Sequence, residues 1–289
     1  MATRKNEPNI NFDRELTKGQ RTYDRAVGEW WLDRSTDGAH TRAYRKIARQ
    51  IRERIAREPR EIIDYACGPG SLLVRLARQF PESRLIGIDG SRKMVEAARA
   101  RLAAQGRPIA ARTEILYSNL PNFALPLQAD LVIFAFPNIC PNADVQPYYD
   151  RHGARHREDV KVARALAKAR EPDPEDETVT QTPEELFMAL IDAKVISRNL
   201  RKLLRKGGTC VRIEYANAPR EEMTDLVRMR LDFEAGSLAR AFGGARAERL
   251  FRLREVSYTR SRVIEDVYHQ TRDEGDRVGG YLISTLTAI

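Results

Sequence analysis

The clearest pattern of apolar and polar positions along the chain lies between Glu61 and Ala77. A short β-forming run leads into the acidic residue Asp64, and a turn of small residues containing Gly68 and Gly70 follows. Apolar residues then recur at helical spacing, namely Leu72, Leu73, Val74, Leu76 and Ala77. This order predicts a buried strand, a tight turn and a helix. Because the turn carries few side-chain atoms, backbone N–H groups at the start of the helix can approach a ligand closely.

Strand patterns and helix patterns alternate along the rest of the chain. The predicted strands are 83–89, 109–117, 129–136, 209–215, 250–258, 263–271 and 278–288, and the predicted helices are 41–56, 92–105, 182–205 and 221–242. Such alternation predicts an α/β fold with a doubly wound, mostly parallel sheet. The last two strands flank residues 272–277, which predicts an antiparallel hairpin in the C-terminal part.

Two segments stand outside this alternation and define the predicted domain organisation. Residues 1–57 precede the first strand, so we expect an N-terminal helical segment followed by a single domain over 58–289. Residues 141–181 are charged and rich in proline, which predicts an insertion within that domain.

Composition excludes several classes of protein. The chain has 289 residues, of which 42% are hydrophobic, enough for a sizeable core. It contains no apolar run of the ~18 residues that a transmembrane helix needs, and its N-terminus lacks the apolar core of a signal peptide. The three cysteines have no metal-type spacing. We therefore expect a cytoplasmic protein with no metal site and no membrane partner.

The net charge of +9 allows two interpretations. It could attract an anionic partner such as nucleic acid, or it could be the solvated surface of an arginine-rich protein. The basic residues are interleaved with acidic ones, and no basic block with aromatic residues between them occurs. This pattern favours the solvated surface.

Candidate chemistry follows the first two strands. Asp89 ends the second strand, 19 residues after Gly70, where a carboxylate can accept the hydroxyl groups of a ribose. It could also simply cap the next helix, as Ser91 could. No third glycine follows the turn, and Asp64 beside it would repel a pyrophosphate. The site therefore fits a nucleoside with an amino-acid tail better than a dinucleotide. Met94 could flank an adenine or belong to the core.

Four segments resemble motifs of class I S-adenosylmethionine-dependent methyltransferases. They are residues 62–70, 85–98, 130–133 and 200–208, and the resemblance covers about residues 58–215. It implies a Rossmann-like seven-stranded sheet with helical additions, S-adenosyl-L-methionine as cofactor, and methyl transfer to an O, N or C atom. The cofactor-binding residues that we predict are Tyr23, Asp64, Ala66, Gly68, Gly70, Asp89, Gly90, Met94, Asn119, Leu120, Phe134 and Phe136.

The chain departs from the family pattern at two positions. Ala66 stands where the first motif has a glycine, and Asn119 stands where the family commonly has an aspartate. Alanine is small and asparagine retains a carbonyl acceptor, so we expect cofactor binding to be kept.

The N-terminal segment carries aromatic residues that could face the cofactor. Tyr23 begins a Tyr-Asp-Arg-Ala stretch that resembles the segment closing over the cofactor in many small-molecule methyltransferases. We therefore predict that residues 1–57 act as a lid. Trp30 and Trp31 could contact the sulfonium cation or only pack the leading helix.

The sequence indicates less about the methyl acceptor than about the cofactor. The candidates for a general base are His40, His152, His156, His269, Glu214 and Tyr215, and none is singled out. The motif after strand four that is typical of enzymes methylating bases or amides is absent. We therefore expect a small-molecule acceptor, with specialised metabolism as its expected setting. A tRNA or rRNA methyltransferase and a non-catalytic cofactor-binding subunit remain as alternatives.

Overall fold

The computed structural model describes Asp24 and residues 26–36, 38–118, 125–136, 160–161, 164, 197–219, 224, 250–261 and 277–289. Every structural statement below concerns these residues. The predicted strand 263–271 lies outside them, as do the predicted helix 221–242 except for residue 224 and nearly all of the predicted insertion 141–181.

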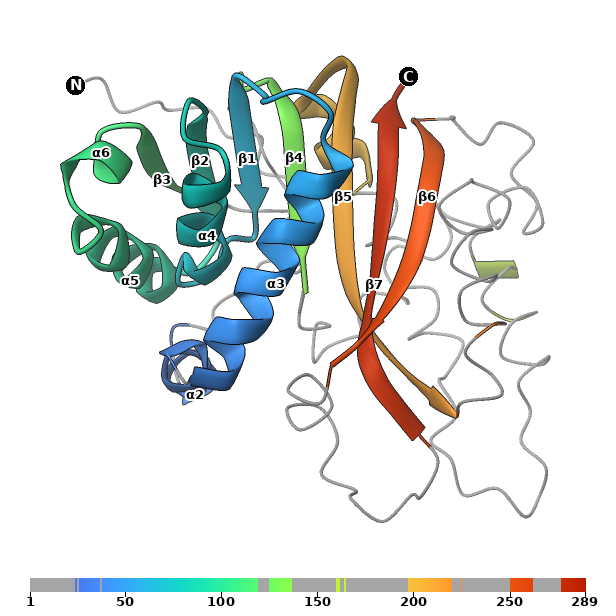
Figure 1. The fold of residues 1–289 in the computed structure, drawn as a ribbon, viewed down its shortest axis with the longest axis horizontal. Helices are drawn as coiled ribbons and strands as arrows, with labels where there is room; N and C mark the ends of the chain where they lie inside the picture. Colours follow the sequence, from blue (N-terminus) through green and yellow to red (C-terminus); the bar gives the residue numbers. More distant parts are fainter. Residues whose placement is uncertain are drawn as a thin grey trace.

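The described strands form one mixed sheet of seven strands in the order β3-β2-β1-β4-β5-β7-β6 (Figure 1). The first five strands pair in parallel, and β7 runs antiparallel to both β5 and β6. Their bounds are β1 Glu61–Tyr65, β2 Arg84–Asp89, β3 Thr113–Tyr117, β4 Ala129–Ala135, β5 Leu204–Pro219, β6 Phe251–Arg260 and β7 Arg277–Ala288. The predicted fold class, a mostly parallel sheet with antiparallel C-terminal strands, is confirmed.

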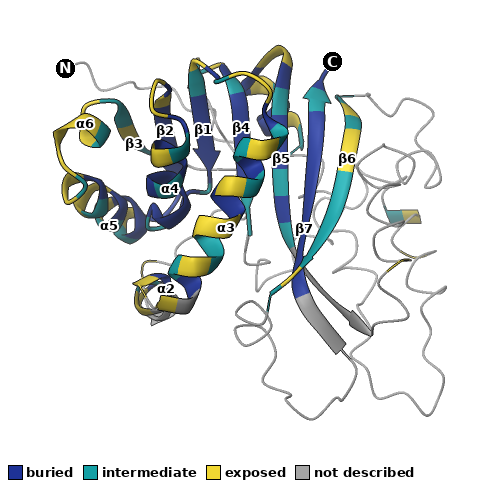
Figure 2. Ribbon diagram, in the orientation of Figure 1, coloured by how far each residue is buried: buried dark blue, intermediate teal, exposed yellow. Residues whose placement is uncertain are grey.

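Two hydrophobic clusters lie on the opposite faces of this sheet. Side chains alternate along β1, so Ile62 contributes to one cluster while Ile63 and Tyr65 contribute to the other. As in other parallel sheets covered on both faces, β1 and β4 are almost entirely buried (Figure 2). The sheet therefore provides a rigid base on which the loops at its carboxyl edge are placed.

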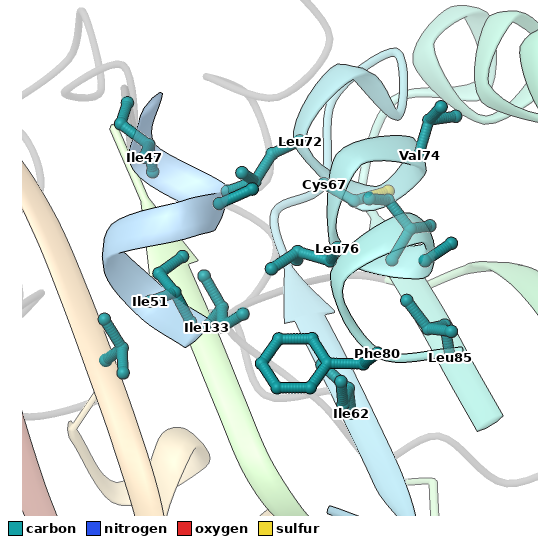
Figure 3. Packing of buried hydrophobic residues seen from close by; sticks show 14 of the residues in the cluster. Ile47, Ile51, Ile62, Cys67, Leu72, Val74, Leu76, Phe80, Leu85 and Ile133 are labelled. Atoms are coloured by element: carbon teal, nitrogen blue, oxygen red, sulfur yellow. The ribbon is translucent and has the colours of Figure 1, made fainter. Parts of the chain in front are cut away.

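Helices α3 (Gly38–Arg54), α4 (Ser71–Gln79) and α5 (Arg92–Ala103) contribute to the first cluster. Ile47 and Ile51 of α3 have no exposed surface, and they lie beside Leu72 and Leu76 of α4 (Figure 3). The helix predicted over 41–56 is thus confirmed, and its outer face is exposed (Figure 2). A further helix, α2 (Ala26–Thr36), precedes α3.

Two element boundaries differ from the sequence prediction. The strand predicted over 109–117 begins only at Thr113, because Gly106 and Pro108 start a short helix, α6 (Arg107–Ala110). The helix predicted to continue to Arg205 ends earlier, and β5 begins at Leu204. Gly207, which follows the predicted end of this helix, lies within β5 in the left-handed region, with φ of 77°.

No helix among the described residues is long and apolar enough to cross a membrane.

Candidate cofactor site

The turn between β1 and α4 is built from residues in the left-handed region. Ala66, Gly68 and Gly70 have φ angles of 64°, 52° and 75°. A Cβ atom on Gly70 would lie 3.2 Å from the Cβ of Ala98, so the absence of a side chain lets α4 pack closely on α5. At Gly68 a Cβ would meet nothing within 4 Å, which leaves its backbone open to an approaching group.

Ala66 adopts the conformation that glycine accepts most easily. For an alanine, the left-handed region costs about 1–2 kcal/mol relative to the right-handed one. The structure thus gives a physical reason for a glycine at this position of the motif. It also shows that the turn keeps its backbone course with alanine there.

Asp89 joins the first two loops of the carboxyl edge. Its Oδ2 accepts a hydrogen bond from the backbone N–H of Gly68 at 2.7 Å, and its Oδ1 accepts one from Ser91 at 2.9 Å. Burial raises the pKa of Asp89 to about 6, although backbone N–H groups, including that of Gly90, act to lower it. The structure therefore brings Gly68, Asp89 and Gly90 together around one carboxyl group that is ionised at neutral pH.

Asp64 lies beside this group at the end of β1 and is 2% exposed. Burial raises its pKa to about 8, and the neighbouring charge of Asp89 adds to the effect. Its Oδ2 is buried and has no hydrogen-bond partner among the described residues. A buried acceptor without a partner is costly, and a ligand amino group would satisfy it. The two carboxyl groups thus fit a ribose and an amino-acid tail.

Two of the predicted cofactor residues, Phe134 and Met94, are buried. Phe134 is 1% exposed and its ring lies 5.5 Å from that of Tyr65, in the cluster on the second sheet face. Met94 is 2% exposed, and its backbone N–H is bonded to Ser91 Oγ at 3.2 Å. Met94 is therefore placed as a buried residue of the first turn of α5.

Phe136 follows β4 in a left-handed conformation, with φ of 48°. Its backbone N–H donates to the carbonyl oxygen of Ile213 at 2.7 Å. Its ring meets those of Tyr44 and Tyr281 edge to face, at centroid distances of 6.3 and 6.0 Å. Phe136 thus stands at the carboxyl edge of the sheet, but its ring packs toward α3 and β7.

Several predicted site residues lie wholly or partly outside the described part of the chain, and others lie at defined places in it. Tyr23, Asn119, Leu120 and His269 lie outside the described residues, as do His152 and His156. Of Tyr215 only the backbone, in β5, is described, and of Trp30 and Trp31 only the backbone, in α2. His40 is 7% exposed in the first turn of α3. Glu214 of β5 forms an ion pair with Arg212 at 2.6 Å.

Sequence reasoning missed the polar contacts that join the N-terminal segment to this site. Asp24 Oδ1 accepts hydrogen bonds from Ser91 Oγ at 2.6 Å and from the Lys93 N–H at 3.2 Å. Ser35, at the end of α2, is bonded to Arg101. The only available signal was that Asp24 directly follows Tyr23 in the predicted lid motif.

Comparison with known proteins agrees with this geometry. Residues 62–159 match the family model of a methyltransferase domain. A trans-aconitate 2-methyltransferase of Rhodococcus jostii is 50% identical over 52 residues, which are 18% of this chain and 20% of that protein. Its counterpart from Methylobacterium radiotolerans is 35% identical over 115 residues, or 35% of this chain and 44% of that protein. The chain thus spans less than half the length of these relatives.

A solved structure shows the same fold over nearly the whole chain. The [4+2]-cyclase SpnF covers 94% of this chain and 96% of its own, with a TM-score of 0.52 and 14% identity. The order of the strands defines a Rossmann-like domain. With the match over residues 62–159, the chain carries a class I S-adenosylmethionine-dependent methyltransferase domain. The predicted family is confirmed, and the cofactor of this class is S-adenosylmethionine.

Proposed function

We propose that the protein transfers the methyl group of S-adenosylmethionine to a small-molecule acceptor. The observation that supports this most strongly is the pair of buried carboxyl groups at the glycine turn. Asp89 holds the turn through Gly68, and Asp64 offers an acceptor oxygen without a partner among the described residues. A match to a methyltransferase domain covers the same residues.

Each described residue of the site has a proposed role. Asp89 accepts the ribose hydroxyl groups, because each of its oxygens has a lone pair left after the bonds to Gly68 and Ser91. Asp64 accepts the amino group of the cofactor's tail, whose charge favours the ionised carboxylate. The backbone at Gly68 lies against the tail. Tyr23, Asn119 and Leu120 are proposed to complete the site.

The reaction needs alignment more than reactive protein groups. When bound, the cofactor would supply a methyl group that is electrophilic because its carbon is attached to a sulfonium sulfur, and the C–S bond would break as the acceptor lone pair bonds to that carbon, which leaves the sulfur as a neutral thioether. The protein holds the reactants in line and excludes water, and orientation of this kind can lower a barrier by ~7–11 kcal/mol. A protonated acceptor also requires a base, for which His40, His269 and Tyr215 remain candidates.

The proposed kind of methyl acceptor is supported by the relatives of the chain rather than by the site. The relatives that match the chain are named for trans-aconitate, a small organic acid, which makes that compound the first acceptor to test. The matched part is short, so a different small molecule is equally compatible with our proposal. A specialised-metabolite acceptor remains part of the proposal.

A labelling experiment tests the proposal directly. The purified protein is incubated with methyl-labelled S-adenosylmethionine and, in parallel, with trans-aconitate, fractionated small-molecule extract or total RNA, with heat-denatured protein as control. We expect label in a small-molecule fraction. Label in RNA alone would support the RNA methyltransferase alternative. Tight cofactor binding without transfer to any fraction would support a non-catalytic subunit.

A further inference from the structure

Arg101, in the last turn of α5, reaches two other helices with its guanidinium group. Its Nη2 donates to Ser35 Oγ at 3.0 Å, and its Nη1 donates to Ser71 Oγ and lies 3.4 Å from the Ser35 carbonyl oxygen. Ser71 Oγ also donates to that carbonyl at 3.4 Å. One side chain therefore joins the end of α2 to the first residue of α4, directly after the glycine turn.

The two serines of this junction are buried and Arg101 is half-buried, and no carboxylate among the described residues accepts from its guanidinium. Ser35 and Ser71 are 5% and 9% exposed, and burial lowers the pKa of the Arg101 guanidinium. Within the described part of the chain, its hydrogen-bond acceptors are two hydroxyl groups and a carbonyl. The carbonyl belongs to the C-terminal end of α2, where a cation is favourable.

The same cation is unfavourable for α4. A positive charge next to a helix N-terminus opposes the helix dipole, and α4 has no acidic residue in its first turn to compensate. The arrangement therefore does not stabilise α4 itself. The hydrogen bonds of Arg101 instead attach α2 to the residue that follows the glycine turn.

A second junction fixes the same N-terminal region to the other loop of the site. Asp24 caps the start of α5 by accepting from Ser91 and Lys93, and Glu29 of α2 pairs with the Lys93 ammonium at 2.7 Å. Ser91 in turn donates its backbone N–H to Asp89. Asp24 thus contacts the loop formed by residues 89–91, and Ser35 of α2 contacts Ser71, the residue that directly follows the loop formed by residues 66–70.

We propose that Arg101 is a positioning residue for cofactor binding, because it holds α2 against the loops formed by residues 66–70 and 89–91. This inference rests on the proposed function. Ser71 and Ser91 take part both in the contacts that dock α2 and in the loops of the site. The equilibrium between docked and undocked α2 is therefore coupled to the equilibrium between ordered and disordered loops. Loss of the junction lowers the fraction of molecules with ordered loops, and the apparent affinity falls by that fraction.

Titration calorimetry with S-adenosylmethionine tests the proposal. We expect Arg101→Gln to raise the Kd roughly fivefold or more, a typical coupling between linked sites. Arg101→Lys should recover part of the affinity, because an ammonium can still donate to one of the two serines. Ser35→Ala should add little in the Arg101→Gln background, since the two changes remove the same contact.

Arg112→Gln is the matched control. The Arg112 guanidinium likewise donates to backbone carbonyls, those of Phe80 at 2.9 Å, Ser83 at 2.8 Å and Ala77, but away from both loops. It should lower the melting temperature and leave the Kd unchanged. Hydrogen exchange of cofactor-free protein should show faster exchange within residues 26–36 in Arg101→Gln only.

The outcomes separate the two proposals. If wild-type protein binds S-adenosylmethionine while Arg101→Gln matches Arg112→Gln in Kd and in exchange of α2, Arg101 has only a structural role and the inference is wrong. If the wild-type protein itself fails to bind, the proposed function is overturned and the inference with it.

Discussion

Gly68 donates its backbone N–H to Oδ2 of Asp89 across 2.7 Å, which ties the turn after β1 to the end of β2. The other oxygen of Asp89 accepts the N–H of Ser91 at the start of α5. Both carboxylate oxygens thus serve as acceptors before any ligand binds. These two hydrogen bonds fix the orientation of the Asp89 carboxyl group between the two loops.

Asp89→Asn tests this relationship. An amide has one acceptor oxygen, so either Gly68 or Ser91 would face an NH₂ group, and such a mismatch costs about 1–3 kcal/mol. We expect lower stability and a cofactor Kd raised roughly tenfold or more, since ~1.4 kcal/mol corresponds to a factor of ten. Denaturant unfolding and titration calorimetry measure the two effects.

Asp130→Asn is the matched control, at the amino end of the sheet. Asp130 accepts the backbone N–H groups of Arg60 and Glu61 at 2.8 and 3.2 Å and pairs with Arg205 at 2.7 Å. We expect a loss of stability with an unchanged Kd. If Asp89→Asn also leaves the Kd unchanged, our assignment of Asp89 to the cofactor is wrong.

The buried carboxyl of Asp64 predicts how stability depends on pH. Its folded pKa of about 8 lies above the ordinary value of 3.8, so between these values the folded protein holds a proton that the unfolded chain has released. Stability without cofactor should therefore fall as the pH rises through this window, by at most ~1.4 kcal/mol per pH unit for one proton. Asp89, with a pKa of about 6, adds to the fall in the lower part of the window.

Asp64→Asn should flatten this dependence, because an amide does not titrate. Urea unfolding from pH 5 to pH 8 gives the slope of the free energy of unfolding against pH for the wild type and for the variant. The difference between the two slopes isolates Asp64, because all other titrating groups are present in both proteins. Equal slopes in the two proteins would show that Asp64 is ionised throughout, and would contradict its raised pKa. Saturating cofactor should also flatten the wild-type curve if its amino group pairs with the carboxylate.

Part of the fold and of the site can be predicted from the sequence, for physical reasons. Strands β1, β2 and β4 are buried on both faces, so they appear as short apolar runs bounded by turn residues. Asp89 ends β2, and Gly68 lies in the turn after β1, the neighbouring parallel strand, so both lie at the carboxyl edge of the sheet. Their proximity follows from the predicted order of elements.

Other features depend on contacts that leave no local pattern. Arg101 meets Ser35 across 66 positions of sequence, and Asp24 meets Ser91 across 67. Single polar residues on predicted helices do not indicate such partners. Phe134 is predicted as a cofactor residue because an aromatic face attracts a sulfonium cation, whereas its burial beside Tyr65 depends on the register of the sheet.

Ala66→Gly should stabilise the protein. Ala66 has φ of 64°, and glycine relieves the left-handed strain at a cost in unfolded-chain entropy. We expect a net gain of about 1 kcal/mol in the free energy of unfolding, measured by denaturant titration. A loss of stability would mean that the methyl group of Ala66 makes packing contacts that outweigh the strain.

Gly70→Ala should have the opposite effect. The new Cβ would be strained at φ of 75° and would also lie 3.2 Å from the Cβ of Ala98, so α4 and α5 would have to separate. Gly68→Ala is the comparison, since it introduces similar backbone strain but meets nothing within 4 Å. We expect Gly70→Ala to destabilise the protein by at least about 1 kcal/mol more than Gly68→Ala. Equal effects would show that backbone strain alone matters at Gly70.

The predicted boundary at residue 57 leads to a deletion experiment. Ile47 and Ile51 of α3 are fully buried in the same cluster as Ile62 and Leu76, so α3 packs as part of the core rather than as a detachable segment. Without these two isoleucines the fold would lose roughly 3–6 kcal/mol of the free energy that their burial contributes, which is comparable to the whole free energy of unfolding of many domains. Removing residues 1–57 should therefore abolish cooperative thermal unfolding. Removing residues 1–23 should leave the unfolding transition in place. A cooperative transition in protein lacking residues 1–57 would establish the boundary at 57 and show that α3 is dispensable for the fold.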